Sequence, residues 1–283
     1  MDDMLEPSEG ESVAALPGPD GLRYRVWAPP GPPRATLAVL TGVMSNTAWF
    51  RPLAARWRAR GYRVVGVERR GSGLNAASGR GDTPSAKVLV DDARAVVEHG
   101  RDPERPLVIV GWCWGAILGV HLGHALGDAV QGLALLTPGL YPSARVAERM
   151  KALAAQAAGQ PAEAPVLDSP ITDEMFTSGP ALDGFVRRDD ARWRRFSPRF
   201  LDVSSRLTMA ARMRLRKLAL PVFVALAEDD ATVDEAATRA ELARLPPDRL
   251  HTTSLPGAHG LQFEAPDALA ERLDAWARDA LGV

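Results

Sequence analysis

The chain has 283 residues, of which 46% are hydrophobic and 24% charged, and its formal net charge is −1 at pH 7. This length is sufficient for one sizeable hydrophobic core. A nearly neutral charge balance excludes the overall basic character typical of nucleic-acid-binding proteins, so we expect no nucleic-acid partner. The single cysteine, Cys113, excludes an intramolecular disulfide and a metal cluster held by cysteines.

The first twenty residues combine several prolines and glycines with Asp2, Asp3, Glu6, Glu9 and Glu11. They have neither the basic start nor the apolar centre of a signal peptide. No apolar run in the chain reaches the roughly 20 residues that cross a bilayer. We therefore expect a flexible acidic tail at residues 1–20, no membrane span and a cytoplasmic location.

Short apolar runs alternate with amphipathic segments along the rest of the chain. The runs predict strands at residues 23–27, 36–40, 63–67, 107–111, 132–136, 221–226 and 250–255. The amphipathic segments predict helices, the clearest at residues 50–60, 84–99 and 265–281. Runs that are apolar on both faces are typical of strands covered by helices on each side. The alternation predicts an α/β fold with a doubly wound, mostly parallel sheet.

One long segment, residues 141–216, contains no convincing strand and is rich in Ala, Arg and Pro. We interpret it as a mainly helical cap inserted into a core formed by residues 21–140 and 217–283.

The most informative motif is Gly111-Trp112-Cys113-Trp114-Gly115, which follows a buried strand and opens a helix predicted at residues 115–126. Glycines two residues before and after Cys113 are typical of a sharp strand-turn-helix elbow, because a Cβ at either position would collide with the neighbouring strand or helix. At a helix N-terminus the thiolate of Cys113 is favoured, and the thiolate is the nucleophilic form. Cysteine is also often buried as a packing residue, so the motif alone leaves both roles open.

A nucleophilic cysteine needs a base, and the chain has five histidines. His259 lies in a Pro-Gly-Ala-His-Gly loop between the last predicted strand and the last predicted helix, a suitable position from which to reach Cys113. His121 and His124 are one helical turn apart, but no third ligand accompanies them. We therefore expect neither a metal site nor a cofactor.

An acidic residue must orient that histidine. The strand at residues 221–226 is followed by Glu228-Asp229-Asp230, and the carboxyl ends of parallel strands face one crevice. With Asp230 as the acid, the order Cys113, Asp230, His259 is the nucleophile-acid-base order of α/β hydrolases.

From about residue 21 onward the chain resembles the monoacylglycerol-lipase-like branch of the α/β-hydrolase superfamily. The segment 68–73, Glu-Arg-Arg-Gly-Ser-Gly, resembles that branch's acidic-x-Arg-Gly-x-Gly turn. The resemblance implies that the backbone amides of Trp114 and Val43 form the oxyanion hole. The loop departs from the family's usual His-Gly start, since Thr41 precedes Gly42.

Cysteine in place of serine bears on the substrate. Forming an acyl-cysteine from an oxygen ester is unfavourable, whereas forming it from another thioester is nearly neutral in energy. The Gly-x-Cys-x-Gly elbow also resembles that of some thioesterases and acyl or aminoacyl shuttles. We therefore expect a thioesterase or acyltransferase that forms an acyl-Cys113 intermediate on a small-molecule or carrier-bound acyl substrate. An ester or lactone hydrolase with the same triad and a non-catalytic binding protein are the alternatives.

The cap sequence offers two further hints. Residues 187–217 contain eleven Arg or Lys and three Asp, a formal charge of +8 (11 − 3), which would suit an acyl carrier protein, a peptidyl carrier protein or coenzyme A. Arginine-rich composition with solvated helix faces is the alternative. The cap's apolar residues line an acyl pocket or pack in the core: Met175, Phe176, Phe185, Trp193, Phe196 and Phe200.

Overall fold

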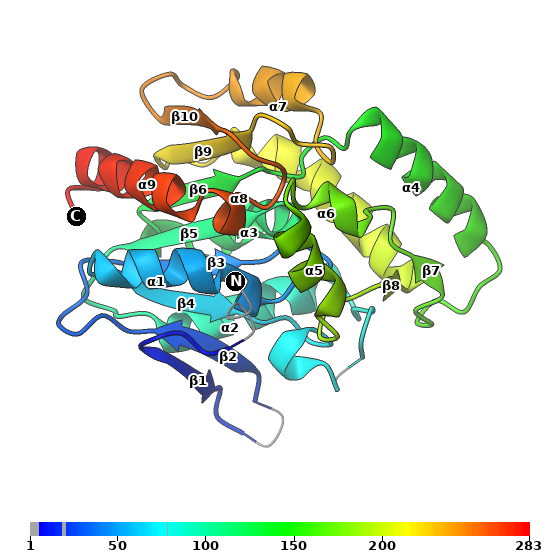
Figure 1. Cartoon of the computed structure of the whole chain (residues 1–283), viewed down its shortest axis with the longest axis horizontal. Helices are drawn as coiled ribbons and strands as arrows, with labels where there is room; N and C mark the ends of the chain where they lie inside the picture. Colours follow the sequence, from blue (N-terminus) through cyan, green and yellow to red (C-terminus); the bar gives the residue numbers. More distant parts are fainter. Residues whose placement is uncertain (1–5, 19–20, 78) are drawn as a thin grey trace.

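The computed structural model describes residues 6–18, 21–77 and 79–283. Figure 1 shows a twisted main sheet with helices on both faces. Its strand order is β1-β2-β4-β3-β5-β6-β9-β10. The strands are β1 (Glu11–Ala15), β2 (Arg23–Trp27), β3 (Thr36–Leu40), β4 (Arg63–Val67), β5 (Leu107–Trp112), β6 (Gly132–Leu136), β9 (Val222–Ala227) and β10 (Leu250–Leu255). β2 pairs antiparallel with β1 and β4, and the other pairs are parallel, so the predicted α/β fold is confirmed.

Helices cover the sheet because its central strands are apolar on both sides. Every residue of β3, β5, β6 and β9 is buried. One face is covered by α1 (Arg51–Ala59) and α9 (Pro266–Leu281), which contact each other, and the other by α2 (Ala86–Gly100) and α3 (Trp114–Leu126). The short helices α7 (Glu235–Leu242) and α8 (Leu261–Glu264) flank β10. Among the described residues, no helix has both the length and the apolar character required to span a membrane.

The predicted flexible tail at residues 1–20 is wrong for Glu11–Ala15, which forms strand β1 at the edge of the sheet. Glu11 fixes this strand through ion pairs with Arg25 at 3.1 Å and Arg51 at 2.8 Å. These pairings join positions far apart in the sequence, so the acidic composition alone did not indicate them. Residues 1–5 and 19–20 lie outside the described part of the chain.

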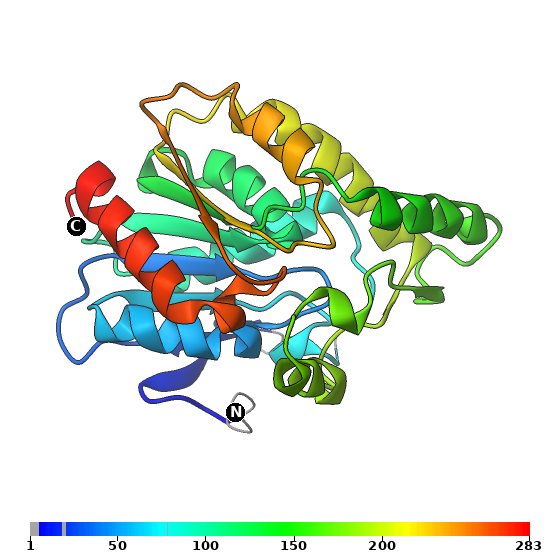
Figure 2. The same ribbon diagram turned by 45° about the horizontal axis from the view of Figure 1, so that its top comes forward.

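The segment predicted as a cap contains α4 (Ala144–Ala157), α5 (Pro180–Arg188) and α6 (Pro198–Leu215). Figure 2 shows α4 extending beyond the body of the molecule, with α6 beside it. The prediction that this segment lacks strands is wrong, because β7 (Leu167–Asp168) and β8 (Arg195–Phe196) form a small antiparallel pair. Two residues in each strand are too few to produce a recognisable alternation of apolar and polar positions.

Candidate active site

Cys113 occupies a tight turn between β5 and α3. Its backbone has φ +54° and ψ −119°, a conformation that L-residues rarely adopt and that surrounding packing must maintain. The flanking glycines permit this packing: a Cβ on Gly115 would lie 2.1 Å from the carbonyl oxygen of Leu40, and one on Gly111 would lie 2.5 Å from the Cα of Ala116. The predicted elbow is therefore present, with the cysteine at its apex.

His259 and Asp230 form a hydrogen-bonded pair although they are 29 residues apart in the chain. His259 Nδ1 lies 2.8 Å from Asp230 Oδ2. Thr232 completes the arrangement, because its hydroxyl lies 2.7 Å from His259 Nδ1 and 2.7 Å from Asp230 Oδ1. Thr232 was not predicted from the sequence, where its position two residues after Asp230 is the only signal for it.

The loop that carries His259 is buried rather than exposed. The imidazole is 0% exposed, and the carbonyl oxygen of His259 accepts hydrogen bonds from Trp112 Nε1 at 3.0 Å and Thr137 Oγ1 at 3.1 Å. Trp112 adjoins Cys113, so the base is tied to the same elbow that carries the predicted nucleophile. His259 Nε2 has no hydrogen-bond partner that meets ordinary geometry among the described residues.

The electrostatics of this group favour an ion pair between protonated His259 and ionised Asp230. Burial opposes protonation of His259, but the negative charge of Asp230 and the charge that Cys113 carries when ionised outweigh it and raise the pKa of His259 to about 10. Burial also acts against ionisation of Asp230, yet the neighbouring His259 and the hydrogen bonds from Thr232 lower the pKa of that carboxyl. The structure thus brings Cys113, His259 and Asp230 into one electrostatically coupled group.

The loop after β3 passes directly beside Cys113. A Cβ placed on Gly42 would lie 3.4 Å from the Cβ of Cys113, and Val43 lines the same cavity as Cys113 and Trp114. The carbonyl oxygen of Gly42 accepts from Arg69 Nη2 at 3.1 Å and from Ser45 Oγ at 3.1 Å. Because a trans peptide is planar, with its C=O and N–H on opposite sides, these bonds aim the Val43 N–H away from Arg69.

Arg69 is a second residue that the sequence analysis did not identify. Its Nη2 also donates to the carbonyl oxygen of Val43 at 2.7 Å, and its Cζ lies 5.1 Å from the ring centre of Trp114 and 4.7 Å from that of Trp193. Burial lowers the pKa of Arg69 to about 10, against the opposing effect of the charges on Glu68 and Cys113. A buried guanidinium therefore holds the loop that carries one of the two expected oxyanion donors.

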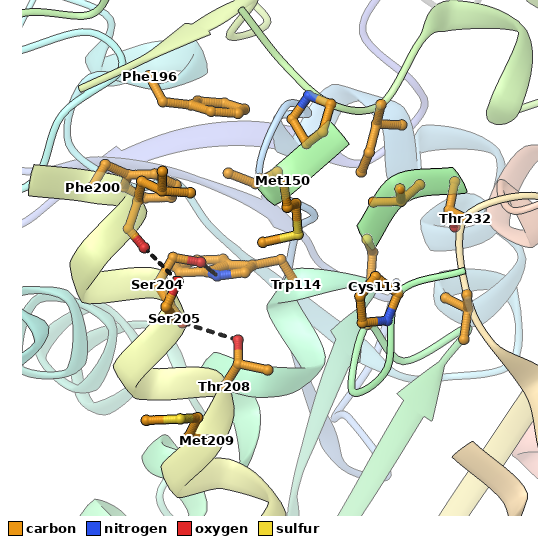
Figure 3. Close-up of a pocket in the computed structure, with 18 of the residues that line it drawn as sticks. Cys113, Trp114, Met150, Phe196, Phe200, Ser204, Ser205, Thr208, Met209 and Thr232 are labelled. Atoms are coloured by element: carbon orange, nitrogen blue, oxygen red, sulfur yellow. Dashed lines mark hydrogen bonds between the residues drawn. The ribbon is translucent and has the colours of Figure 1, made fainter. Parts of the chain in front are cut away.

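Cys113 opens into a mostly apolar cavity of about 270 Å³ between the core and helices α4 and α6. Figure 3 shows Trp114 lying between Cys113 and the side chains of α6, and Trp114 Nε1 donates to Ser204 Oγ at 2.7 Å. Of the apolar cap residues for which the sequence leaves two roles open, Phe196 and Phe200 line this cavity. The other members of that set are buried without lining it: Met175, Phe176, Phe185 and Trp193.

His121 and His124, the pair on helix α3, do not belong to the group formed by Cys113, His259 and Asp230. His121 Nε2 lies 2.9 Å from the carbonyl oxygen of Leu207, and His124 Nε2 lies 3.0 Å from that of Arg214. Within the described ranges, no three His, Cys, Asp or Glu side chains come together as a metal site would require.

Much of the predicted positive charge in residues 187–217 is paired. Carboxylates from outside this segment bind several of its arginines: Asp173 binds Arg192 and Arg194, Asp168 binds Arg195, Asp82 binds Arg199, and Glu241 binds Arg216. Inside the segment, Asp202 binds Arg206. The formal charge of +8 thus overstates the unpaired positive charge that this face presents.

The fold and the geometry of the site together define an α/β hydrolase. The elbow that carries Cys113 faces a mostly apolar cavity. The chain belongs to the family described as serine aminopeptidase, S33 (Hydrolase_4), whose model matches residues 31–266. Here cysteine stands at the apex of the elbow in a family named for serine.

Individual relatives are distant in sequence. The chain is 24% identical over 213 residues to a phospholipase, YtpA, of Bacillus subtilis (strain 168), covering 72% of this chain and 78% of that protein. Its fold is similar to a soluble variant of monoglyceride lipase from Saccharomyces cerevisiae, with a TM-score of 0.81, 14% identity and coverage of 98% and 97% of the two chains. Monoacylglycerol lipase from Paleococcus ferrophilus gives a TM-score of 0.77 at 16% identity, with 90% and 98% coverage. At these identities the solved structures establish the fold and not the substrate.

Proposed function

We propose that the protein is a cysteine-dependent acyl-transfer enzyme that forms a covalent acyl-Cys113 intermediate from thioester-activated acyl groups. The observation that carries this proposal is the coupling of Cys113 at the elbow to the hydrogen-bonded His259–Asp230 pair, 2.8 Å apart, beside an apolar cavity. A non-catalytic binding protein would not need these three groups in one cluster.

In the first half of the reaction the Cys113 thiolate attacks the substrate carbonyl carbon, and a carbon–sulfur bond forms. The amides of Trp114 and Val43 are the expected donors to the resulting oxyanion. When this intermediate collapses, the bond to the leaving thiol breaks, and the departing sulfur takes a proton from His259 Nε2. Asp230 stabilises the imidazolium before that step and fixes its orientation throughout.

In the second half, water or an acceptor thiol gives its proton to His259 and attacks the acyl carbon. Collapse of the second tetrahedral intermediate expels Cys113 as the thiolate and releases the free acid or the new thioester. Hydrolysis and transfer differ only in which acceptor enters. The apolar lining of the cavity favours an acyl chain as the group held there during both steps.

A second candidate is hydrolysis of an oxygen ester by the same three residues. Family membership and the lipase-like fold favour it, whereas the cysteine nucleophile favours thioesters. A carrier-protein or coenzyme A partner and a cytoplasmic location stay predictions. The pairing of most arginines in residues 187–217 reduces the support for carrier docking.

The two candidates are separated by matched substrates. We would measure kcat/KM for a series of acyl thioesters of N-acetylcysteamine and for the oxygen esters of the same acyl chains. Thioester turnover that exceeds ester turnover after correction for the uncatalysed rates supports the proposal. Cys113→Ala should abolish turnover. Equal or better ester turnover would transfer the assignment to the ester hydrolase, and turnover that persists in Cys113→Ala would refute the role of Cys113.

A further inference from the structure

Apart from Cys113 itself, one of the described residues that line the cavity beside it has a charged side chain: Arg212 of α6. Its neighbours in the lining are apolar residues and uncharged hydroxyl-bearing residues such as Ser204 and Thr208. A cation beside an apolar cavity carries a desolvation cost unless an anion compensates it. Arg212 is half-buried, so water hydrates part of it, and its remaining donors are open to an anionic group in the cavity.

The protein fixes Arg212 in place without neutralising it. Its Nε donates to the carbonyl oxygen of Leu140 at 2.9 Å, and its Nη2 donates to the same oxygen. Its Cζ lies 3.9 Å from the ring centre of Tyr141. The partners in these contacts are a carbonyl oxygen and an aromatic ring, and neither carries a formal negative charge. Within the described part of the chain, no hydrogen-bonded acceptor is seen for Nη1, and no carboxylate lies within ion-pair distance of Arg212.

Two other arginines nearby are paired with carboxylates, whereas Nη1 of Arg214, on the same helix, lies 3.0 Å from His121 Nδ1. Arg206, on the same helix, binds Asp202 at 3.0 Å, and Arg216, just beyond the end of α6, binds Glu241 at 2.8 Å. Glu241 is also the acceptor for the Tyr141 hydroxyl at 3.0 Å, so an acidic residue is present nearby but pairs with other cations. Of these arginines, Arg212 alone lines the cavity.

Two contacts place Arg212 within reach of a substrate bound to Cys113. The N–H of Gly139 donates to the carbonyl oxygen of Cys113 at 3.0 Å, and the next residue, Leu140, supplies the oxygen that holds Arg212. On α6, Ser204, Thr208 and Arg212 follow at intervals of four residues and so share one face. At one end of that face the Ser204 hydroxyl accepts a hydrogen bond from Trp114 Nε1, and at the other end lies the guanidinium of Arg212.

We propose that Arg212 binds an anionic group of the substrate, distant from the reacting carbonyl. This group is either a carboxylate on the acyl chain or a phosphate on the leaving group. A guanidinium binds both groups through paired N–H donors. The unpaired Nη1 supplies the donors, and the bonds to Leu140 hold the group ready without further ordering. This inference rests on the proposed function, since it concerns the substrate of the same cavity.

The test measures binding in the Cys113→Ala background, so that it does not depend on turnover. Calorimetry would compare the glutaryl thioester of N-acetylcysteamine with its uncharged methyl ester, and then a butanoyl thioester of phosphopantetheine with that of pantetheine. We expect the anionic member of one pair to bind about 10- to 100-fold more tightly, the effect of one charge-assisted interaction. A preference within the glutaryl pair places the anionic group on the acyl chain, and a preference within the pantetheine pair places it on the leaving group.

Arg212→Gln should abolish this preference, and Arg212→Lys should retain part of it because the charge remains. Arg206→Gln, on the same helix but outside the cavity lining, is the matched control and should leave the preference unchanged. Equal binding within both pairs, or a preference that survives Arg212→Gln, overturns the proposal. Turnover of the uncharged thioesters by the enzyme with Cys113 intact is measured separately, so failure of the proposed function would be seen there and not in these affinities.

Discussion

Replacing Arg69 by methionine should impair catalysis far more than stability. Arg69 Nη2 donates to the carbonyl oxygens of Gly42, Val43 and Ser45. Two of these keep another donor in the variant, because Ser45 Oγ bonds Gly42 and Ser72 Oγ bonds Ser45. Only the carbonyl oxygen of Val43 loses its sole side-chain donor.

One buried acceptor left unsatisfied costs about 1–3 kcal/mol. The variant also avoids burying a guanidinium whose Nε and Nη1 have no hydrogen-bond partner within the described structure, and this gain offsets part of that cost. The lost cation–π contacts with Trp114 and Trp193 add to the cost, so we expect a net loss of about 1–2 kcal/mol in the free energy of unfolding.

Catalysis should suffer more because the Val43 amide is no longer held in one direction. Loss of a preorganised oxyanion donor reduces kcat by roughly 100- to 1,000-fold in acyl-transfer enzymes. We would measure kcat/KM on an acyl thioester together with the rate of Cys113 alkylation by iodoacetamide, a reaction that forms no oxyanion. The prediction is a large fall in kcat/KM, a much smaller change in alkylation and a fall of only a few degrees in Tm.

Arg63→Met is the matched control, because Arg63 also donates to a main-chain carbonyl, that of Gly100 at 2.7 Å, but from the opposite end of β4. Its kcat/KM should stay close to that of the unaltered enzyme. A folded Arg69→Met variant with full kcat/KM would refute the reasoning. Equal losses in alkylation and turnover would also contradict it, since they would indicate damage to the nucleophile and not to the oxyanion loop.

Three further predictions follow from individual contacts. Gly115→Ala should prevent stable folding, because its Cβ would lie 2.1 Å from a main-chain oxygen, whereas Gly123→Ala on the same helix meets only contacts of 3.6 Å and should be neutral or stabilise by about 1 kcal/mol in thermal unfolding. Asp230→Asn removes a charge that raises the pKa of His259, so NMR titration should show His259 losing its proton at a lower pH than the value of about 10 in the unaltered protein; an unchanged titration would contradict the coupling. Glu11→Ala removes the carboxylate that Arg25 and Arg51 share, although Arg25 keeps its pair with Glu68, and it should lower the free energy of unfolding in urea by about 1.5–3 kcal/mol; a change near zero would show that β1 contributes little.

The sequence predicts the sheet well because its central strands are buried on both faces and therefore read as unbroken apolar runs. The observed β3, β4 and β6 have the predicted bounds, and β5 and β9 differ by a single residue at their ends. The elbow is equally readable, since the close approach of backbone at Gly111 and Gly115 excludes any Cβ. These features depend on local sequence.

The contacts missed by the sequence analysis are those that depend on the tertiary fold. Thr232 becomes important only when the loops after β9 and β10 meet, and Arg69 only when the loop after β3 lies across it. Strand β1 is similar, because Glu11 finds its arginines on β2 and α1. No short pattern in the chain records such pairings.

The central claim is that the acyl group passes through Cys113. The most direct measurement is to mix the protein with an acyl thioester, quench with acid within milliseconds to minutes, digest and locate the added mass. We expect an acyl mass on the peptide that contains Cys113, removed by neutral hydroxylamine and absent in Cys113→Ala. Turnover with an acyl group on another residue, or an adduct that resists hydroxylamine, would contradict it.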